Sequence, residues 1–230
     1  MKESDLLTHF PRLWHMAEDG SFDSIREHGL LSTTALLDLY KMEGEERRLL
    51  ESARRPQSVR ISKPGLPDAM VRDQKPMTED ALQKCLPAGF PPSQWFELLN
   101  DRTFFWLNRE RLRGLLGAKA YRKHPQTVLT IDTASLLEAH RNRVELSPLN
   151  SGATLYIPQP RDRDTFRTIA DYPFDDWMKK RRKPEMSVVE LVVKGGVPDI
   201  SDHLIAAHRV HNQERKELWR RPGTKADDGP

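Results

Sequence analysis

The chain has 230 residues, of which 37% are hydrophobic and 31% are charged, and its net charge is only +3. This length suffices for one domain with a buried core, and no run approaches the roughly 20 apolar residues of a transmembrane helix. The acidic N-terminus does not resemble a signal peptide, and a single cysteine, Cys85, excludes a disulfide framework and a cysteine-based zinc site. We therefore expect a cytoplasmic protein that does not bind membranes.

In chain order, an apolar stretch over 13–16 predicts a first strand that ends at the turn of Asp19 and Gly20. Polar residues that can cap a helix precede the apolar positions that follow, and they predict the helices of the first half. These helices are expected over 21–28, 32–40, 43–55, 78–86 and 91–99. The proline-rich stretch between the third and fourth helices predicts a loop with short extended pieces at 59–61 and 69–74.

The second half has runs of β-branched and aromatic residues, which predict strands. These strands are expected over 103–107, 128–131, 154–157, 187–193 and 205–210. Helices are expected over 108–116, 132–137, 164–170 and 174–180. The strands and helices do not alternate regularly, so the pattern favours an α+β fold with five to seven short strands and peripheral helices. We expect a single domain over 1–212 and a charged, flexible tail over 213–230.

Glu190 is the most informative acidic residue, because it interrupts an apolar strand. Strand alternation places Val188, Glu190 and Val192 on one face, and both faces of the strand are otherwise apolar. A carboxylate is costly to bury, so it must face solvent, have a partner or line a cleft. The alternative is a glutamate on an edge strand that points to water.

His15 and an aromatic run are further candidates. His15 also interrupts an apolar strand, where a structural histidine is the simpler interpretation. In the run of Phe104, Phe105 and Trp106 the side chains alternate, and they form either part of the core or a flat surface on which a ring or base stacks.

Five consecutive cations form the basic block: Lys179, Lys180, Arg181, Arg182 and Lys183. Such a block can bind phosphates through the release of counterions, although a solvated surface would have the same composition. His203, His208 and His211 resemble a set of metal ligands in their spacing, but they span a strand and we expect no metal site.

Both ends of the chain resemble the DarT-like and related ADP-ribosyltransferases. His15, Ile25 and the stretch from His28 to Leu31 resemble the opening of those enzymes, with a strand histidine, a short helix and a Gly-Leu turn. Glu190 with the apolar residues after it, followed by Val197-Pro198 and a last strand, resembles their closing part, where a glutamate carries the catalysis. The two matches bracket roughly residues 12 to 210, which is nearly the whole chain.

The resemblance implies a split β-sheet core and an NAD-dependent transferase of the glycosyltransferase class. Cleavage of nicotinamide from NAD passes through an oxocarbenium-like ribosyl cation, as glycoside cleavage does. Glu190 would be the catalytic residue, and NAD would be the co-substrate, with no metal. The expected NAD-binding residues are His15 on a ribose hydroxyl, Phe105 or Trp106 on the nicotinamide, and Arg72 on the pyrophosphate, with Arg102 as the second choice.

DarT-like enzymes modify DNA bases, so the resemblance implies a toxin-like protein that acts on nucleic acid. A single strand or a flipped base is the expected target, because a duplex hides the reacting atom. The basic block precedes the Glu190 strand, where related transferases select the acceptor. The sequence does not decide whether an antitoxin or other regulator binds the protein.

Two other functions remain open. One is a catalytically inactive module of the same fold that binds a nucleotide or nucleic acid. The other is a transferase that removes an RNA phosphate onto NAD, which would need several phosphate-binding arginines and a second histidine in the cleft. The chain lacks the His-Tyr pair and the Ser-Thr-Ser strand of better-known subclasses, and 44–86 has no counterpart in them.

Overall fold

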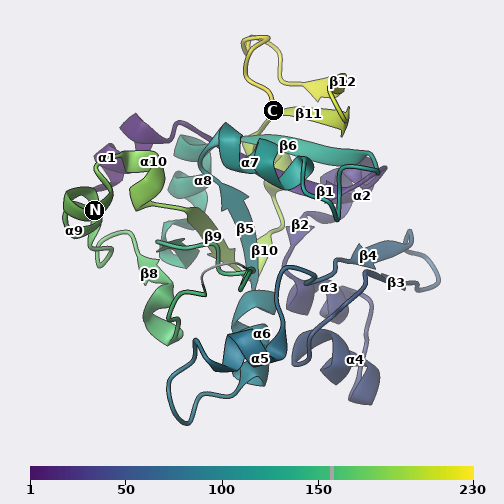
Figure 1. The fold of residues 1–230 in the computed structure, drawn as a ribbon. Coiled ribbons are helices and arrows are strands. Elements are labelled where there is room, and N and C mark those ends of the chain that lie inside the picture. The colour runs from purple at the N-terminus through teal and green to yellow at the C-terminus, as the bar shows by residue number, and fades with distance from the viewer. Residues whose placement is uncertain (156–157) are drawn as a thin grey trace.

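The computed structural model describes residues 1–155 and 158–230, and it combines helices with a large antiparallel sheet (Figure 1). The main sheet has eight strands in the order β12-β11-β6-β1-β5-β9-β7-β8. These strands are β1 (Arg12–Glu18), β5 (Arg102–Trp106), β6 (Gln126–Asp132), β7 (Val144–Ser147), β8 (Arg167–Thr168), β9 (Glu190–Lys194), β11 (Leu204–His211) and β12 (Glu214–Arg220). The fold class is therefore α+β, as the sequence predicts, but the sheet has more strands than the five to seven expected.

Two small sheets and the helices complete the described structure. β2 (Leu30–Leu31) pairs with β10 (Gly196–Val197), and β3 (Val59–Ile61) pairs with β4 (Ala69–Val71). The helices are α1 (Glu3–His9), α2 (Phe22–His28), α3 (Thr33–Leu39), α4 (Gly44–Glu51), α5 (Glu79–Gln83), α6 (Pro92–Asn100), α7 (Arg109–Leu116), α8 (Thr133–His140), α9 (Phe174–Arg181), α10 (Pro184–Ser187) and α11 (Ile200–His203). Two short 3₁₀ helices lie at Arg141–Arg143 and Arg163–Thr165.

The sheet has a discontinuity at its centre, between β1 and β5. β1 pairs with β6 along its whole length, from Arg12 opposite Asp132 to Glu18 opposite Gln126. With β5, in contrast, β1 pairs only where Trp14 lies opposite Trp106. The two halves of the sheet thus diverge on either side of this pair, and backbone groups next to it are free to take other partners.

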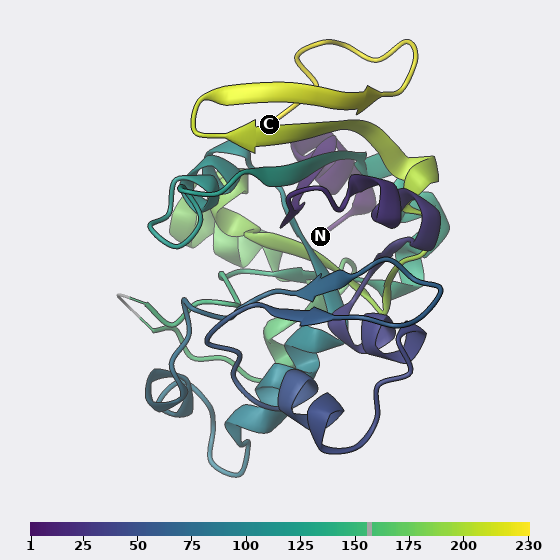
Figure 2. The ribbon, with the colours of Figure 1, turned by 90° about the vertical axis from the view of Figure 1, so that its right-hand side faces the viewer.

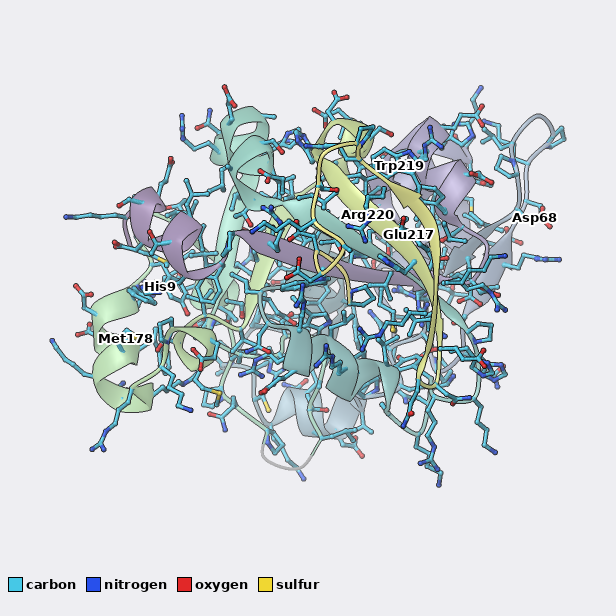
Figure 3. All side chains as sticks on the ribbon, turned by 90° about the horizontal axis from the view of Figure 1, so that it is seen from above. His9, Asp68, Met178, Glu217, Trp219 and Arg220 are labelled. Carbon is cyan, nitrogen blue, oxygen red and sulfur yellow. The ribbon has the colours of Figure 1, made fainter. Side chains whose placement is uncertain are left out.

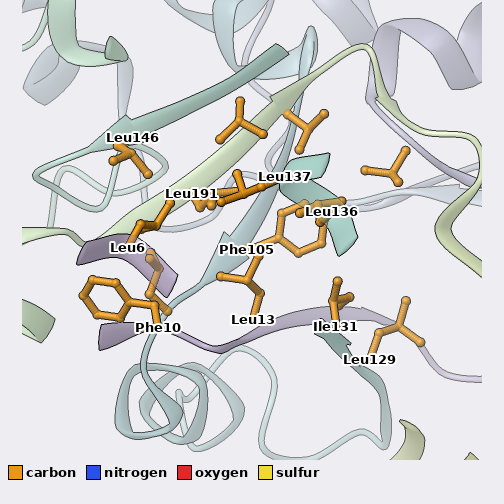
Figure 4. Packing of buried hydrophobic residues seen from close by; sticks show 14 of the residues in the cluster. Leu6, Phe10, Leu13, Phe105, Leu129, Ile131, Leu136, Leu137, Leu146 and Leu191 are labelled. Atoms are coloured by element: carbon orange, nitrogen blue, oxygen red, sulfur yellow. The ribbon is translucent and has the colours of Figure 1, made fainter. Parts of the chain in front are cut away.

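The main core packs against the central strands, where leucine, isoleucine and phenylalanine side chains from distant parts of the chain meet (Figure 4). Leu6 and Phe10 come from the N-terminal helix region, Leu13 from β1, Phe105 from β5 and Leu191 from β9. Full burial of such a side chain contributes about 1.5–3 kcal/mol each. This core fixes β1, β5 and β9, and with them the residues that the strands carry.

Residues 33–71, most of which have no counterpart in the resembling enzymes, form a small core of their own. Leu37 and Tyr40 pack there with Leu50 of α4, Ile61 of β3 and Val71 of β4. Figure 2 shows the β3–β4 hairpin next to α3 and α4, on one side of the main sheet. The hairpin is held as a unit, so it can form a stable wall beside the sheet.

Two glycines allow the close approach of the segments around β2 and β10. Gly29 has a φ of +89°, and a Cβ atom there would lie 2.5 Å from Cα of Pro198. Gly196 has a φ of +91°, and a Cβ atom there would lie 2.6 Å from the carbonyl oxygen of Leu30. Only glycine fits both the positive φ and the space. The Gly-Leu turn singled out in the sequence therefore has a packing role.

Several expectations for local structure are wrong or untested. The tail expected to be flexible from residue 213 instead forms β12, which pairs with β11, and Figure 3 shows Glu217, Trp219 and Arg220 on it. The helix expected over 164–170 is a 3₁₀ turn followed by β8. Of the strand expected over 154–157, residues 154–155 are not in a strand, and 156–157 lie outside the described residues. No helix in the described part of the chain is long and apolar enough to cross a bilayer.

Candidate active site

Glu190 begins β9, and its side chain is buried, with the residue only 4% exposed. It lies opposite Trp106 of β5, and the backbone N–H of Ser151 donates a hydrogen bond to Oε2 at 3.1 Å. Burial raises the pKa of Glu190 to about 7, while hydrogen bonding from Ser151 and the charges of Arg161 and Arg111 oppose the rise. A carboxyl with this pKa exists in both protonation states near neutrality, which suits a residue that accepts a proton.

Arg161 fixes the loop that contacts Glu190. Its guanidinium donates to the carbonyl oxygens of Ser151 and Ala153, each at 3.0 Å, and to that of Gln159 at 3.1 Å. The residue is 3% exposed. Because one buried side chain spans three carbonyls, the position of the Ser151 N–H depends on it. Arg161 is thus a positioning residue for the carboxylate.

His15 lies on β1 at the discontinuity of the sheet. Its Nδ1 is 2.8 Å from the carbonyl oxygen of Phe104 on β5. Burial lowers the pKa of His15 to about 4, the hydrogen bond to Phe104 opposes this, and the charge of Arg72 adds to it. The ring is therefore neutral at physiological pH.

Arg72 directly follows β4 and faces the main sheet. Its Nη1 donates to Oε1 of Gln126 at 2.8 Å and lies 3.4 Å from Oε2 of Glu18. The guanidinium carbon also lies 5.2 Å from the centroid of the Tyr121 ring. The side chain keeps 24% of its surface exposed, so a ligand can reach it.

One cavity of about 730 Å³ joins these residues. Its walls come from β1, the segment around α2 and β2, the β3–β4 hairpin and β5, and its lining includes His15, Arg72, Trp106 and Glu190. His15, Arg72 and Glu190, which lie far apart in the sequence, thus line the same cavity. This volume is in the usual range for sites that bind small molecules or cofactors.

The two aromatic candidates on β5 differ in accessibility. The residue Phe105 is 1% exposed and belongs to the main core, with its ring centroid 5.9 Å from that of His15. Trp106 is half-buried and lines the cavity on the same face of the sheet as Glu190. Trp106 is therefore the aromatic side chain of this pair that has a surface to offer a ligand, and Phe105 supports His15 from the core.

Arg102, the second choice for a pyrophosphate ligand, is held by other contacts. Its guanidinium donates to Oε2 of Glu145 at 2.9 Å and to the carbonyl oxygen of Leu98 at 2.8 Å. Its side chain is 5% exposed, and Lys194 binds the other oxygen of Glu145 at 2.8 Å. Arg102 thus belongs to a buried ion-pair network, although it also touches the cavity. Arg72 is the better candidate for phosphate.

The basic block is divided between exposed and structural residues. Lys179 and Lys180 lie exposed on the last turn of α9, and Arg182 and Lys183 are exposed beyond it. Arg181 instead donates to the carbonyl oxygens of Pro148 and Met186 and lies 4.3 Å from the ring centroid of Trp177. Four of the five cations are therefore exposed to a ligand, although Lys179 also pairs with Asp176 at 3.4 Å and Lys180 lies over the ring of Trp177.

The sequence interpretation missed the residues that tune Glu190. Ser151 and Arg161 lie 39 and 29 positions before Glu190 in the numbering, and Arg111 comes from α7. Asn150 and Gly152, which line the cavity, stand with Ser151 in a run of turn-forming residues. That run predicts a loop, but nothing in the local sequence indicates that the loop reaches β9.

Of the histidines with metal-like spacing, the structure does not bring His203, His208 and His211 together as one group. His208 lies 3.6 Å from Glu217 on β12, whereas His203 lies with His140 and Asp199. His140, Asp199 and His203 could together hold a metal ion, and none of the three lines the cavity.

Comparison with known proteins identifies a family whose function is unknown. The model of a family of unknown function (DUF7002) matches residues 11–204. No curated protein and no solved structure matches the sequence significantly.

Proposed function

We propose that this chain, which belongs to the DUF7002 family, is an NAD-dependent ADP-ribosyltransferase. The observation that carries the proposal is the shared cavity, in which the buried carboxyl of Glu190 and the neutral imidazole of His15 come from opposite sides of the β1–β5 discontinuity. The single cysteine suits a reducing compartment, so we place the activity in the cytoplasm.

The chemistry needs a carboxylate beside the reacting ribose. The bond between nicotinamide nitrogen and the ribose carbon breaks, its electron pair leaves with nicotinamide, and the ribose gains oxocarbenium character. The carboxylate of Glu190 would stabilise this charge and hydrogen-bond the ribose hydroxyls. The acceptor then attacks the same carbon, and its proton passes to Glu190, whose pKa of about 7 suits that role.

The other candidate residues would bind the dinucleotide. Nε2 of His15 would accept a hydrogen bond from a ribose hydroxyl, and Trp106 would contact the nicotinamide ring. Arg72 would bind the pyrophosphate, for which it has to exchange the amide of Gln126 for a stronger, charged acceptor. Oε2 of Glu18 lies 3.4 Å from Nη1 of Arg72 and would orient the arginine before the ligand binds.

We propose nucleic acid as the acceptor, because the exposed cations of the basic block lie shortly before β9. α9 ends in this block, and only α10 separates it from Glu190. The half-buried Trp177 on the same helix contacts Lys180 and Arg181. Cations next to an aromatic ring are the usual means of binding a single strand.

Nicotinamide release tests the proposal. The purified chain is incubated with NAD and a single-stranded DNA or RNA oligonucleotide, and nicotinamide and modified oligonucleotide are measured by chromatography and mass spectrometry. Glu190→Gln should lose about two to four decades of rate. Glu110→Gln, which changes an exposed glutamate on α7, serves as the matched control and should keep full activity.

Each outcome is decisive. Equal nicotinamide release by the parent and Glu190→Gln would remove the assignment of Glu190. NAD or oligonucleotide binding without any release would favour the inactive binding module instead.

A further inference from the structure

A second cluster of side chains lies where the end of α8 meets α11. His140 ends α8, Asp199 directly precedes α11, and His203 ends it. Nε2 of His140 lies 2.7 Å from Oδ1 of Asp199, and Nε2 of His203 lies 3.5 Å from Oδ2. One ligand atom from each residue lies within 4.8 Å of the other two. The geometry points to a divalent metal site made of two imidazoles and one carboxylate, with zinc as the ion.

The atoms that face one another in this cluster have no polar partner outside it in the described structure. Nε2 of His140, Oδ1 of Asp199 and Nε2 of His203 are all buried, and within the described structure their polar contacts are the ion pairs among themselves. The side chains of the two histidines are 7% and 5% exposed. The pair of His140 and Asp199 is close, at 2.7 Å, whereas Nε2 of His203 lies 3.5 Å from the carboxylate and makes no hydrogen bond. A cation among these atoms would be bound by all three at once, which accounts for two buried imidazoles that turn Nε2 to one carboxylate.

Asp199 faces the histidines with its side chain and does not cap its own helix. It is the N-cap residue of α11, where an aspartate normally accepts a hydrogen bond from the first turn, yet its side chain makes no cap hydrogen bond. His203 is oriented from behind, because its Nδ1 lies 3.1 Å from Oγ of Ser135. When Nδ1–H donates to that hydroxyl, Nε2 keeps the lone pair that a metal needs.

Arg143 sets a condition on metal binding. Its Nη2 lies 2.6 Å from Nδ1 of His140, and since a guanidinium only donates, Nδ1 accepts and Nε2 carries the proton in this arrangement. A metal on Nε2 requires the other tautomer. Arg143 can release the imidazole and stay in place, because its Nη1 also donates to the carbonyl oxygens of Lys194 and Gly196. This arginine therefore competes with the metal.

Zinc fits the site better than magnesium or calcium, which prefer oxygen ligands. Zinc binds imidazole nitrogen at about 2.0–2.1 Å and accepts four ligands, so a water molecule would complete the set. The ion would join α8 to the segment directly after β10, where Pro198 packs on Gly29 near the cavity wall. Bound there, the ion would cross-link these two segments and so stabilise the fold.

Metal content and thermal stability test the site without reference to activity. The full chain, made without a histidine tag, is stripped with EDTA, exposed to zinc chloride, desalted and analysed by plasma mass spectrometry. We expect about one zinc per chain, and a Tm higher by roughly 5 °C or more when zinc is in hundredfold excess over Kd. Cobalt in place of zinc should give the visible absorption bands of a four-coordinate site.

Variants locate the ion. His203→Gln and Asp199→Asn should bind zinc at least tenfold more weakly. The matched control is His208→Gln, which changes another buried histidine, 3.6 Å from one carboxylate but without a third ligand, and it should keep the parent's affinity. Arg143→Met removes the competing donor and should bind zinc as tightly as the parent or more tightly.

The proposal is overturned if the folded parent chain holds no zinc after exposure and shows no change in Tm. Equal zinc in the parent and His203→Gln would also overturn it, since the ion would then lie elsewhere. If the ligand variants do not fold, the stoichiometry, Tm and cobalt spectrum of the parent decide the question.

Discussion

Nδ1 of His15 lies 2.8 Å from the carbonyl oxygen of Phe104, so the imidazole bridges β1 and β5 next to the one place where these strands pair. A carbonyl only accepts, and hence Nδ1 carries the proton and Nε2 keeps its lone pair. The pKa of this histidine falls to about 4 while that of Glu190 rises to about 7. Both shifts favour the neutral form of the group. Two titratable groups in one cavity with pKa values shifted in opposite directions are typical of a catalytic site.

The pH dependence of the transferase reaction should report Glu190. The reaction needs the carboxylate, so kcat/KM should rise by about tenfold per pH unit below 7 and level off above about pH 8. His15, with a pKa of about 4, stays neutral throughout this range. The measurement is the rate of nicotinamide release from about pH 5.5 to about pH 9 in buffers of constant ionic strength. A profile that falls as the pH rises would contradict the role of the carboxylate.

Stability should change with pH in the opposite sense to activity. The folded pKa of Glu190, about 7, is raised above its ordinary value of 4.5, so its contribution is fully present below 4.5 and is lost as the pH rises through 7. Above pH 4.5 the parent must therefore either keep a proton on Glu190 or bury its charge, which lowers the free energy of unfolding. Glu190→Gln removes this cost, because glutamine does not ionise. The variant should gain up to about 3 kcal/mol in free energy of unfolding over the parent between pH 4.5 and 8.

Urea unfolding at several pH values checks this difference, with Glu110→Gln as the control that should track the parent. A constant difference between Glu190→Gln and the parent across the range would show that Glu190 does not titrate with a raised pKa.

Arg72 and Arg102 should separate binding from stability. Arg72→Met removes a partly exposed side chain and should raise KM for NAD at least tenfold, with a small change in Tm. Arg102→Met leaves Glu145 partly unpaired in the interior and should lower the free energy of unfolding by about 3 kcal/mol, with KM unchanged. Steady-state kinetics and urea unfolding measure the two effects. The reverse pattern would make Arg102 the pyrophosphate ligand.

The double variant Arg102→Met/Glu145→Met provides an internal check on that network. It replaces the ion pair by apolar groups and should recover part of the lost stability. No recovery would mean that Arg102 acts through contacts other than Glu145.

The exposed cations of the basic block should determine the salt dependence of nucleic-acid binding. Replacing Lys179, Lys180, Arg182 and Lys183 with glutamine should reduce the slope of log K against log salt by up to about 3 for a single strand, since each phosphate contact contributes about 0.7. Fluorescence anisotropy with a labelled oligonucleotide measures the slope. The control replaces four exposed lysines on other elements, Lys41, Lys84, Lys123 and Lys216, and an equal effect there would indicate binding by net charge alone.

The starts of four helices followed from the sequence. Ser32, Thr78, Asn108 and Asp132 were expected to begin helices, and each accepts a hydrogen bond from a backbone N–H in the first turn. Such signals are readable because a cap and its acceptor lie within a few residues of each other. The prediction of a flexible tail over 213–230 was wrong for residues 214–220, because their strand depends on a partner that is not visible in the local sequence. These charged residues favour solvent locally, but β11 offers an edge with which β12 can pair.

The sequence by itself determined that Glu190 and His15 each interrupt an apolar strand. A polar residue among apolar neighbours can be recognised within a short stretch of sequence. Only the tertiary structure decided that these residues share a cavity, that Arg161 fixes the loop bound to Glu190, and that His140 meets Asp199 and His203. The cavity, the contact of Ser151 with Glu190 and the contact of His140 with Asp199 all join segments that lie at least 39 residues apart. Their geometry depends on how the strands pair and diverge, which no local pattern of side chains encodes.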